Sequence, residues 1–395
     1  MRFILFTLIC LGLSILLPVP ALAYFAQKYE PADGRIIHGM GQYVTLYYTD
    51  NENWTYINQY VSSVGKTPAI LSAYWGIAPA AVTLNANPNL YDLANNHGNQ
   101  YRLMIGVALV DQDMTVPVTT ILSGAWDPQI ISLADSIKVL GTPTFVRPGF
   151  EFGSGNSGYH ADKMTGAEYI AIWRHLRQVF ANRGVTNVAW IWNTVNPDTF
   201  NYMDYYPGDD QVDWWGINYF TYGQMVYGTD FVNDAYTHHK PVFVSESNPI
   251  ENNGTSNPAN WNSWFVPYFS LFSSHPNLKG FIYISNPWNK PGFWQEWPDS
   301  RINTNPTILQ NYSAQLSQPK FIHLEEYLAS PSSTITPIPS PQPGDANGDG
   351  KIDGVDYTTW LINFGKQFIG HTFGDFNNNG IVDGIDYVIW LVNYN

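Results

Sequence analysis

Two glutamates stand at the ends of strongly apolar runs, where a carboxylate is unusual unless it has a task. Glu151 lies in FVRPGFEFG, residues 145–153, and Glu246 closes the apolar run of residues 242–244. Buried carboxylates are rare in proteins and cluster at functional sites. A pair of them suits the cleavage of a glycosidic bond, in which one acid protonates the leaving oxygen and the other group attacks or activates water. The alternative is a carboxylate pair that only ties strands together.

A second set of candidate residues lies near the C-terminus, where one acidic pattern begins at Gly344 and again at Gly374. Asp or Asn occupies alternate positions, and Gly follows at the sharp turn, as in a calcium loop of the EF-hand type. Position 12 is Asp, where a standard EF-hand has Glu. We expect two structural calcium ions; two acidic turns without metal are the alternative. The predicted ligands are Asp345, Asn347, Asp349, Lys351 (backbone carbonyl), Asp353 and Asp356, then Asp375, Asn377, Asn379, Ile381 (backbone carbonyl), Asp383 and Asp386.

The elements that position the two glutamates are apolar runs that alternate with helical patterns. The runs are continuous in hydrophobicity, which is typical of parallel strands buried on both faces. They predict an α/β fold, a (β/α)8 TIM barrel, whose active site lies at the C-terminal ends of the strands. Glu151 ends the fourth predicted strand and Glu246 the seventh. The predicted strands are 36–39, 69–75, 103–109, 145–151, 188–193, 212–219, 242–246 and 281–285, and the helical patterns are 126–139, 166–182, 231–239, 261–272 and 306–316.

The remaining segments set the domain boundaries. Residues 1–23 combine Arg2, an apolar stretch and small residues at 21 and 23, which predicts a secretory signal peptide. The apolar stretch is shorter than the about 20 residues that a membrane span needs. Cys10 is the only cysteine, so a mature chain would have no disulfide. We expect a barrel domain at 24–328, a Ser/Thr/Pro-rich linker at 329–343, and a small α-helical calcium-binding domain at 344–395. The protein should be secreted, extracellular or attached to the cell surface.

Composition narrows the partners. The net charge is −14 with 18 Lys and Arg, which argues against nucleic acid. Aromatic residues make up 16% of the chain, and many lie beside Asn, Gly and Pro, which suits stacking on sugar rings. Trp75 and Trp192 are candidate platforms of this kind, or else core residues. His38 is as compatible with a core histidine as with a ligand, and no spacing in the barrel indicates a catalytic metal.

The barrel resembles family 26 of the clan A glycoside hydrolases in three motifs: RPGFEF around Glu151, YYPGDDQVDWWGINYF at 205–220, and KPVFVSES around Glu246. The resemblance implies that Glu151 is the acid/base and Glu246 the nucleophile. It also implies that Tyr219 hydrogen-bonds the nucleophile and that Arg147 lies beside it. The alternatives are that Arg147 is a structural ion-pair partner and Tyr219 a core aromatic.

Two further substrate-binding residues follow from the same resemblance. Trp288 would form the floor of the subsite at the scissile bond, although it too could be a core aromatic. Phe150 stands where mannanases of this family usually have His, and clan A enzymes acting on β-1,3-glucan have similarly aromatic motifs. Both β-mannan and β-glucans therefore remain open as substrates.

The duplicated calcium loop and helix resemble a type I dockerin module. The resemblance implies a cohesin-bearing scaffold or cell-surface protein as partner. At loop positions 10 and 11 the chain has Gly354-Val355 and Gly384-Ile385, where dockerins that bind cohesin often have polar pairs.

These observations predict a secreted, monomeric, retaining endo-β-glycanase that hydrolyses a polysaccharide by double displacement, with no catalytic cofactor. Glu246 should be ionised, and Glu151 should have a raised pKa. The alternative function is a non-catalytic carbohydrate-binding barrel displayed through its dockerin-like tail.

Overall fold

The computed structural model of this protein describes residues 24–44, 48–79, 87–95, 100–111, 115–153, 163–291, 296–329, 343–346, 351–366, 374–377 and 381–394. The predicted signal peptide and residues 330–342 of the predicted linker lie outside these ranges. No helix within them is long and apolar enough to cross a bilayer.

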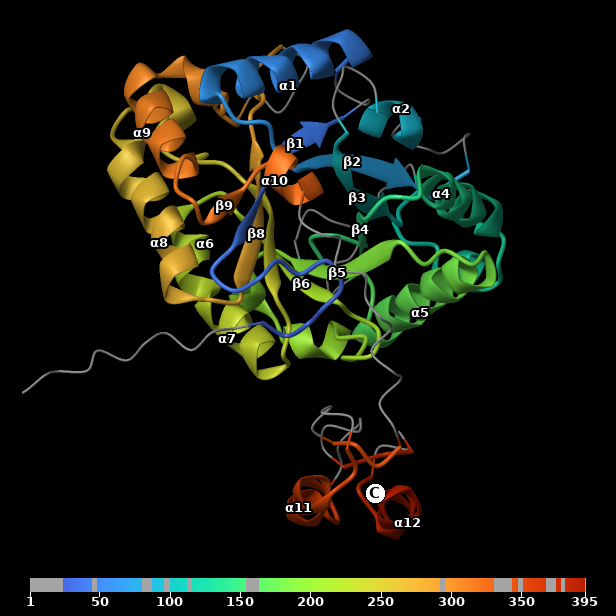
Figure 1. The fold of residues 1–395 in the computed structure, drawn as a ribbon. Coiled ribbons are helices and arrows are strands. Elements are labelled where there is room, and N and C mark those ends of the chain that lie inside the picture. The colour runs from blue at the N-terminus through green and yellow to red at the C-terminus, as the bar shows by residue number, and fades with distance from the viewer. Residues whose placement is uncertain are drawn as a thin grey trace, which may run out of the picture.

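Eight parallel strands close into a barrel (Figure 1). Hydrogen bonding runs in the order β2-β3-β4-β5-β6-β7-β8-β1, and pairing between β1 and β2 closes the ring. A ninth short strand, β9 (Phe321–Ile322), pairs with the start of β1. The barrel strands are β1 (Ile36–Tyr43), β2 (Ile70–Gly76), β3 (Arg102–Ala108), β4 (Thr144–Pro148), β5 (Val188–Thr194), β6 (Trp214–Tyr219), β7 (Val242–Ser247) and β8 (Leu278–Ile284).

Helices surround the barrel (Figure 1), as in the predicted (β/α)8 fold. The longest two begin with a capping box, Thr49 with Glu52 and Thr165 with Glu168, which satisfies the free N–H groups of the first turn. A π-helical turn (Trp261–Phe265) precedes α8. The helices are α1 (Asp50–Val64), α2 (Leu90–Asn95), α3 (Val118–Leu122), α4 (Asp127–Leu140), α5 (Gly166–Asn182), α6 (Tyr222–Tyr227), α7 (Thr229–Thr237), α8 (Val266–Ser274), α9 (Pro306–Leu316) and α10 (Leu324–Ala329).

The barrel interior has two layers of different chemistry. Its lower layer is apolar and includes Ile37, Met104, Phe145, Trp214 and Phe243, all fully buried. The upper layer, toward the C-terminal ends of the strands, is polar and is described below. A larger apolar cluster fills the space between the strands and the helices. The barrel thus supplies a rigid apolar base for a polar site at its upper end.

The C-terminal unit contains two helices, α11 (Gly354–Asn363) and α12 (Gly384–Asn393), which lie side by side (Figure 1). They pack as a symmetric pair. Trp360 donates from Nε1 to the Asp383 carbonyl at 2.9 Å, and Trp390 donates to the Asp353 carbonyl at 3.0 Å. The ring of Tyr357 lies 5.0 Å from that of Trp390. The aromatic residues of the two helices thus pack against each other with pseudo-twofold symmetry.

Leu361 and Leu391 lie outside this interface, because both are about half exposed. Phe364 is exposed as well, although its ring contacts Trp360 at 5.0 Å. Helices of ten residues bury only a narrow stripe, and the aromatic rings already fill it.

Candidate active site

Glu246, on β7, is held by two donors from distant strands. Its Oε1 accepts a hydrogen bond from Nη1 of Arg147 on β4 at 2.9 Å and from the Tyr74 hydroxyl on β2 at 2.7 Å. Arg147 is fully buried, so this is a desolvated ion pair with a fixed orientation. Among the described residues, Oε2 of Glu246 accepts no hydrogen bond. That oxygen is therefore the one available to a substrate.

A chain of side-chain amides connects this pair to Glu151. Arg147 donates from the same Nη1 to Oδ1 of Asn193 on β5 at 2.9 Å. Asn193 donates to Oδ1 of Asn218 on β6 at 3.1 Å, and Asn218 donates to Oε1 of Glu151 at 2.8 Å. Arg147, Asn193 and Asn218 have no solvent exposure. Because the Arg147 guanidinium can only donate, it fixes the orientation of the Asn193 amide, which in turn fixes that of Asn218. Each amide therefore directs its N–H donor toward the Glu151 end of the chain.

Glu151 itself sits in a strained turn rather than in a strand. β4 ends at Pro148, three residues earlier than predicted, and Glu151 has φ +58°, a left-handed conformation that is uncommon for a residue other than Gly. Neighbouring groups hold the turn in place. The Tyr169 hydroxyl donates to the Pro148 carbonyl at 3.0 Å, and the Thr194 hydroxyl donates to the Phe152 carbonyl at 2.9 Å. Strain supported in this way is typical of functional sites.

The electrostatics separate the two carboxyl groups. Burial, and after it the nearby charge of Glu246, raises the pKa of Glu151 to about 7, against the Asn218 hydrogen bond and the charge of Arg147. This confirms the predicted direction. Burial, then the charge of Glu246, also raises the pKa of Tyr74, so its hydroxyl stays protonated and donates. Two titratable groups with opposed environments are the arrangement that separates an acid from a nucleophile.

Two glycines inside the barrel make room for these side chains. A Cβ on Gly106 would lie 2.8 Å from the Tyr74 ring, and one on Gly216 would lie 2.8 Å from the Ser245 hydroxyl and 2.9 Å from Asn193. Any larger residue there would displace a member of the site. The glycines of β3 and β6 are thus required by the polar side chains of the site, which need the space that a Cβ would occupy.

Three predicted substrate-binding residues do not belong to this site. Tyr219 points outward: a Cβ on Gly228, before α7, would lie 2.9 Å from its hydroxyl, which has no hydrogen-bond partner among the described residues. Trp192 is fully buried against Phe231 of α7, with ring centroids 5.6 Å apart. Trp75 belongs to the same outer cluster. The reason is the strand period of two: the residues before or after them, Tyr74, Asn193 and Asn218, face inward.

Two other predicted residues lie at the upper end of the barrel. Phe150 packs on Tyr74 with ring centroids 5.2 Å apart, and the Arg147 guanidinium lies 5.3 Å from the Phe150 ring. Trp288 follows β8, is 2% exposed, and packs against Phe220 and Trp297. Phe150 is therefore part of the site, whereas the role of Trp288 as a sugar platform stays a prediction. His38 is a core histidine, fully buried and hydrogen-bonded to Tyr60 and His323.

The predicted calcium loops are described only in part, because Asn347, Asp349 and Asn379 lie outside the described residues. Asp345, Asp356, Asp375 and Asp386 are buried. Asp356 and Asp386 each accept two or more backbone N–H groups, which tie the start of a loop to its helix. Within the described ranges no three His, Cys, Asp or Glu residues gather as a metal site. The carboxylate oxygens suit calcium chemically, and the two ions stay a prediction. The other predicted ligand positions, Lys351, Asp353, Asn377, Ile381 and Asp383, flank or begin the helices.

No protein-family model matches this chain. A β-1,3-xylanase of a Vibrio species, TXYA, is 27% identical over 359 residues, which cover 80% of this chain and 74% of that protein. A β-1,3-xylanase of an Alcaligenes species is 26% identical over 348 residues, 79% of this chain and 71% of that protein. A family 26 (GH26) β-mannanase from Bacteroides ovatus shares the fold, with a TM-score of 0.55 and 15% identity over 73% of this chain and 88% of that one.

Proposed function

We propose that this glycoside hydrolase is a secreted, retaining endo-β-glycanase that acts on β-1,3-linked xylan. That it is a glycosidase follows from its relatives. One observation carries the mechanism: two carboxyl groups with opposed environments meet at the C-terminal end of the barrel, joined by one chain of hydrogen bonds.

In the first step, Oε2 of Glu246 attacks the anomeric carbon while Glu151 gives its proton to the leaving glycosidic oxygen. The bond between the anomeric carbon and that oxygen breaks, and a glycosyl ester forms on Glu246. In the second step, the now ionised Glu151 takes a proton from water, whose oxygen attacks the anomeric carbon and releases Glu246. Two displacements retain the configuration at that carbon.

The residues around the two glutamates have separate roles. Arg147 and Tyr74 hold Oε1 of Glu246, so the carboxylate presents its other oxygen and does not rotate between the steps. Burial alone would lower the pKa of Arg147, but the Glu246 carboxylate raises it, so the guanidinium stays charged. Asn218 donates to Glu151, which stabilises the ionised form that the second step needs.

Two observations support the choice of substrate. Both relatives that match about four-fifths of this chain are β-1,3-xylanases. Phe150 contributes an apolar ring beside Arg147, at the position where the family's mannanases have His, so this site lacks a polar partner for the sugar there. The sequence pointed to β-mannan or a β-glucan, and those polymers are the comparison substrates.

For the tail we propose a dockerin-like unit with two calcium ions and a cohesin-bearing partner. Support comes from the duplicated loops and from the symmetric packing of α11 on α12. Calcium would stabilise the loops, because the ligands must otherwise crowd their charges.

The test is a hydrolysis screen over β-1,3-xylan, β-mannan, β-1,3-glucan, mixed-linkage glucan and β-1,4-xylan with the full chain and a Glu246→Gln variant. We expect reducing ends from β-1,3-xylan alone or most rapidly, and none from the variant. Release from another polymer first would correct the substrate. Binding without hydrolysis of any polymer would favour the carbohydrate-binding barrel instead.

A further inference from the structure

Hydrogen bonds hold the Arg147 guanidinium at only one of its three nitrogens. Nη1 donates to Oε1 of Glu246 and to Oδ1 of Asn193, each at 2.9 Å. Nε and Nη2 are buried, and neither has a hydrogen-bond partner among the described residues. The guanidinium is planar, and two hydrogen bonds to one corner do not fix the tilt of that plane. Other groups must therefore keep it in place.

Two aromatic rings lie against the guanidinium. Its central carbon is 5.3 Å from the centroid of the Phe150 ring and 5.7 Å from that of the Tyr74 ring. The two rings also contact each other, with centroids 5.2 Å apart. A cation within about 6 Å of a ring is attracted to it, and more strongly where water is excluded, as it is around the fully buried Arg147. The rings thus supply contacts on the parts of the guanidinium that the hydrogen bonds do not hold.

The strands bring these groups into one layer of the barrel interior. Tyr74, Gly106 and Arg147 are paired in register across β2, β3 and β4. Gly106 leaves room in the middle of the layer, because a Cβ there would lie 2.8 Å from the Tyr74 ring and 3.1 Å from the Phe150 ring. The backbone turns sharply after β4, where Gly149 has φ +54°, and the Phe150 ring lies over this space. The local sequence therefore places an aromatic ring on the guanidinium.

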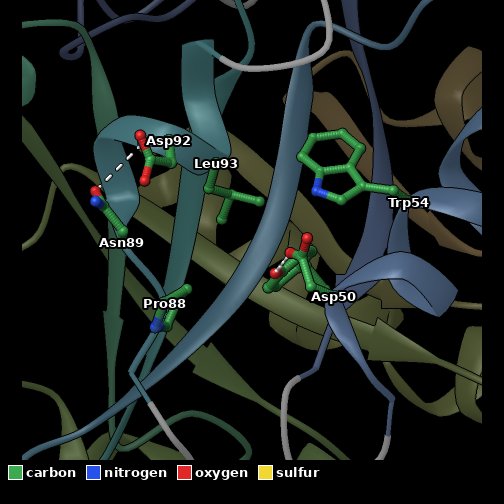
Figure 2. A pocket seen from close by; sticks show the side chains of 7 residues that line it. Asp50, Trp54, Pro88, Asn89, Asp92 and Leu93 are labelled. Atoms are coloured by element: carbon green, nitrogen blue, oxygen red, sulfur yellow. Dashed lines mark hydrogen bonds between the residues drawn. The ribbon is translucent and has the colours of Figure 1, made fainter.

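The opposite face of β2 has a different environment. Trp75, the residue after Tyr74, belongs to the apolar cluster between the strands and the helices. A recess of about 240 Å³ lies on that outer side, and Figure 2 shows Trp54 and Leu93, two members of the same cluster, among the residues that line it. The recess is thus separated by β2 from Arg147, which has no exposure to solvent and is held from inside the barrel.

We propose that Phe150 is a positioning residue for the nucleophile, and that it acts through Arg147 rather than by binding the sugar. Its ring fixes the guanidinium plane, so that Nη1 holds Oε1 of Glu246 and leaves Oε2 directed at the anomeric carbon. The inference rests on the proposed function, because it concerns the attack by Glu246. This role differs from the substrate-binding role that the sequence predicts for Phe150.

The experiment separates attack from binding. The full chain is inactivated with a 2-deoxy-2-fluoro-β-xyloside that has a good leaving group. The dependence of the inactivation rate on reagent concentration gives two constants: the rate constant of ester formation and the dissociation constant of the reagent. Phe150→Leu and Phe150→Met both remove the ring and keep an apolar side chain. We expect each to lower the rate constant about tenfold, the effect of losing a desolvated contact between a cation and a ring, and to leave the dissociation constant unchanged.

Two further variants serve as controls. Phe150→Tyr keeps the ring and should react almost as fast as the parent chain. Phe321→Leu is the matched control for the loss of a ring, because Phe321 is a buried residue on β9 and Nζ of Lys320 lies 5.3 Å from its ring centroid. This control removes a contact of the same kind away from the site. It should lower stability and leave both constants unchanged.

The positioning role would be overturned if the two ringless variants reacted as fast as the parent chain. Weaker binding of the reagent with an unchanged rate constant would make Phe150 a contact of the sugar and would overturn it too. An equal loss in Phe150→Tyr would show that the ring is not the group that acts. If the reagent did not inactivate the parent chain, the proposed function itself would be rejected, and the inference with it.

Discussion

The amide of Asn218 should set the pH range of the enzyme. Its Nδ2 donates to Glu151 at 2.8 Å, and this bond opposes burial and the charge of Glu246, which together still raise the pKa of Glu151 to about 7. Asn218→Leu removes the donor and nearly conserves the volume. A hydrogen bond to a charged group contributes about 1.5–3 kcal/mol, and 1.36 kcal/mol corresponds to one pKa unit. The pKa of Glu151 should therefore rise to about 8 to 9 by this estimate.

The sign follows from the role of Glu151. It must be protonated to act as the acid in the first step, so the alkaline limb of kcat/KM reports its pKa in the free enzyme. In Asn218→Leu that limb should move upward by about one to two pH units. Arg147 and Tyr74 still hold Glu246 in this variant, so the nucleophile keeps its orientation.

The assay is the pH profile of kcat/KM on a β-1,3-xylo-oligosaccharide. Asn277→Leu is the matched control, because Asn277 is equally buried but donates to the Val232 carbonyl away from the site. It should lower stability and leave the profile unchanged. An alkaline limb that stays fixed or moves downward in Asn218→Leu would refute this reading of the hydrogen-bond chain.

Three other predictions follow from the same structure. Glu151→Ala should slow the cleavage of substrates with poor leaving groups by about 10²–10⁴-fold and leave the cleavage of activated aryl glycosides almost unchanged. Azide should restore the activity of this variant. If the variant lost activity on both substrate classes, another residue would have to be the acid. His38 and His323 lie with their Nδ1 atoms 2.9 Å apart, and burial lowers the pKa of both. They therefore stay neutral in the folded protein, whereas in the unfolded chain they become protonated below about pH 6.5. The free energy of unfolding, measured with denaturant, should be at its full value above that pH and fall by up to about 2.7 kcal/mol per pH unit below it. In His323→Gln the free energy of unfolding should depend less steeply on pH. An equally steep dependence in this variant would contradict the reasoning. A chelator should remove a minor calorimetric transition of residues 344–395 without changing hydrolysis, and loss of hydrolysis or identical scans would count against calcium folding.

The architecture and the glutamate pair could be predicted from the sequence. Buried parallel strands leave long apolar runs, so the sequence predicts the eight strands to within a few residues. Gly166–Asn182 and Pro306–Leu316 have the predicted bounds, because a capping residue and an amphipathic pattern mark both. Glu151 and Glu246 stood out since a charge in an apolar run needs a partner.

The neighbours of the pair were harder to predict, for one physical reason. A strand buried on both faces has no apolar–polar alternation, so the sequence does not tell which residues face inward. The sequence favours Trp75 over Tyr74 and Tyr219 over Asn218, although the structure shows the reverse. A polar residue at the end of an apolar strand is the sequence feature that indicates a site residue. Asn193 and Asn218 show this feature as clearly as the two glutamates do. The sequence does not predict helix α1, because its pattern is mostly polar.

The most direct test of the account is to find which residue carries the sugar in the reaction intermediate. The full chain is incubated with a 2-deoxy-2-fluoro-β-xyloside that has a good leaving group, and the trapped ester is located by peptide mapping with mass spectrometry. The account predicts one xylosyl label per chain, on Glu246. A label on Glu151 or on any other residue would contradict it, as would turnover of this reagent to an inverted product with no labelled peptide.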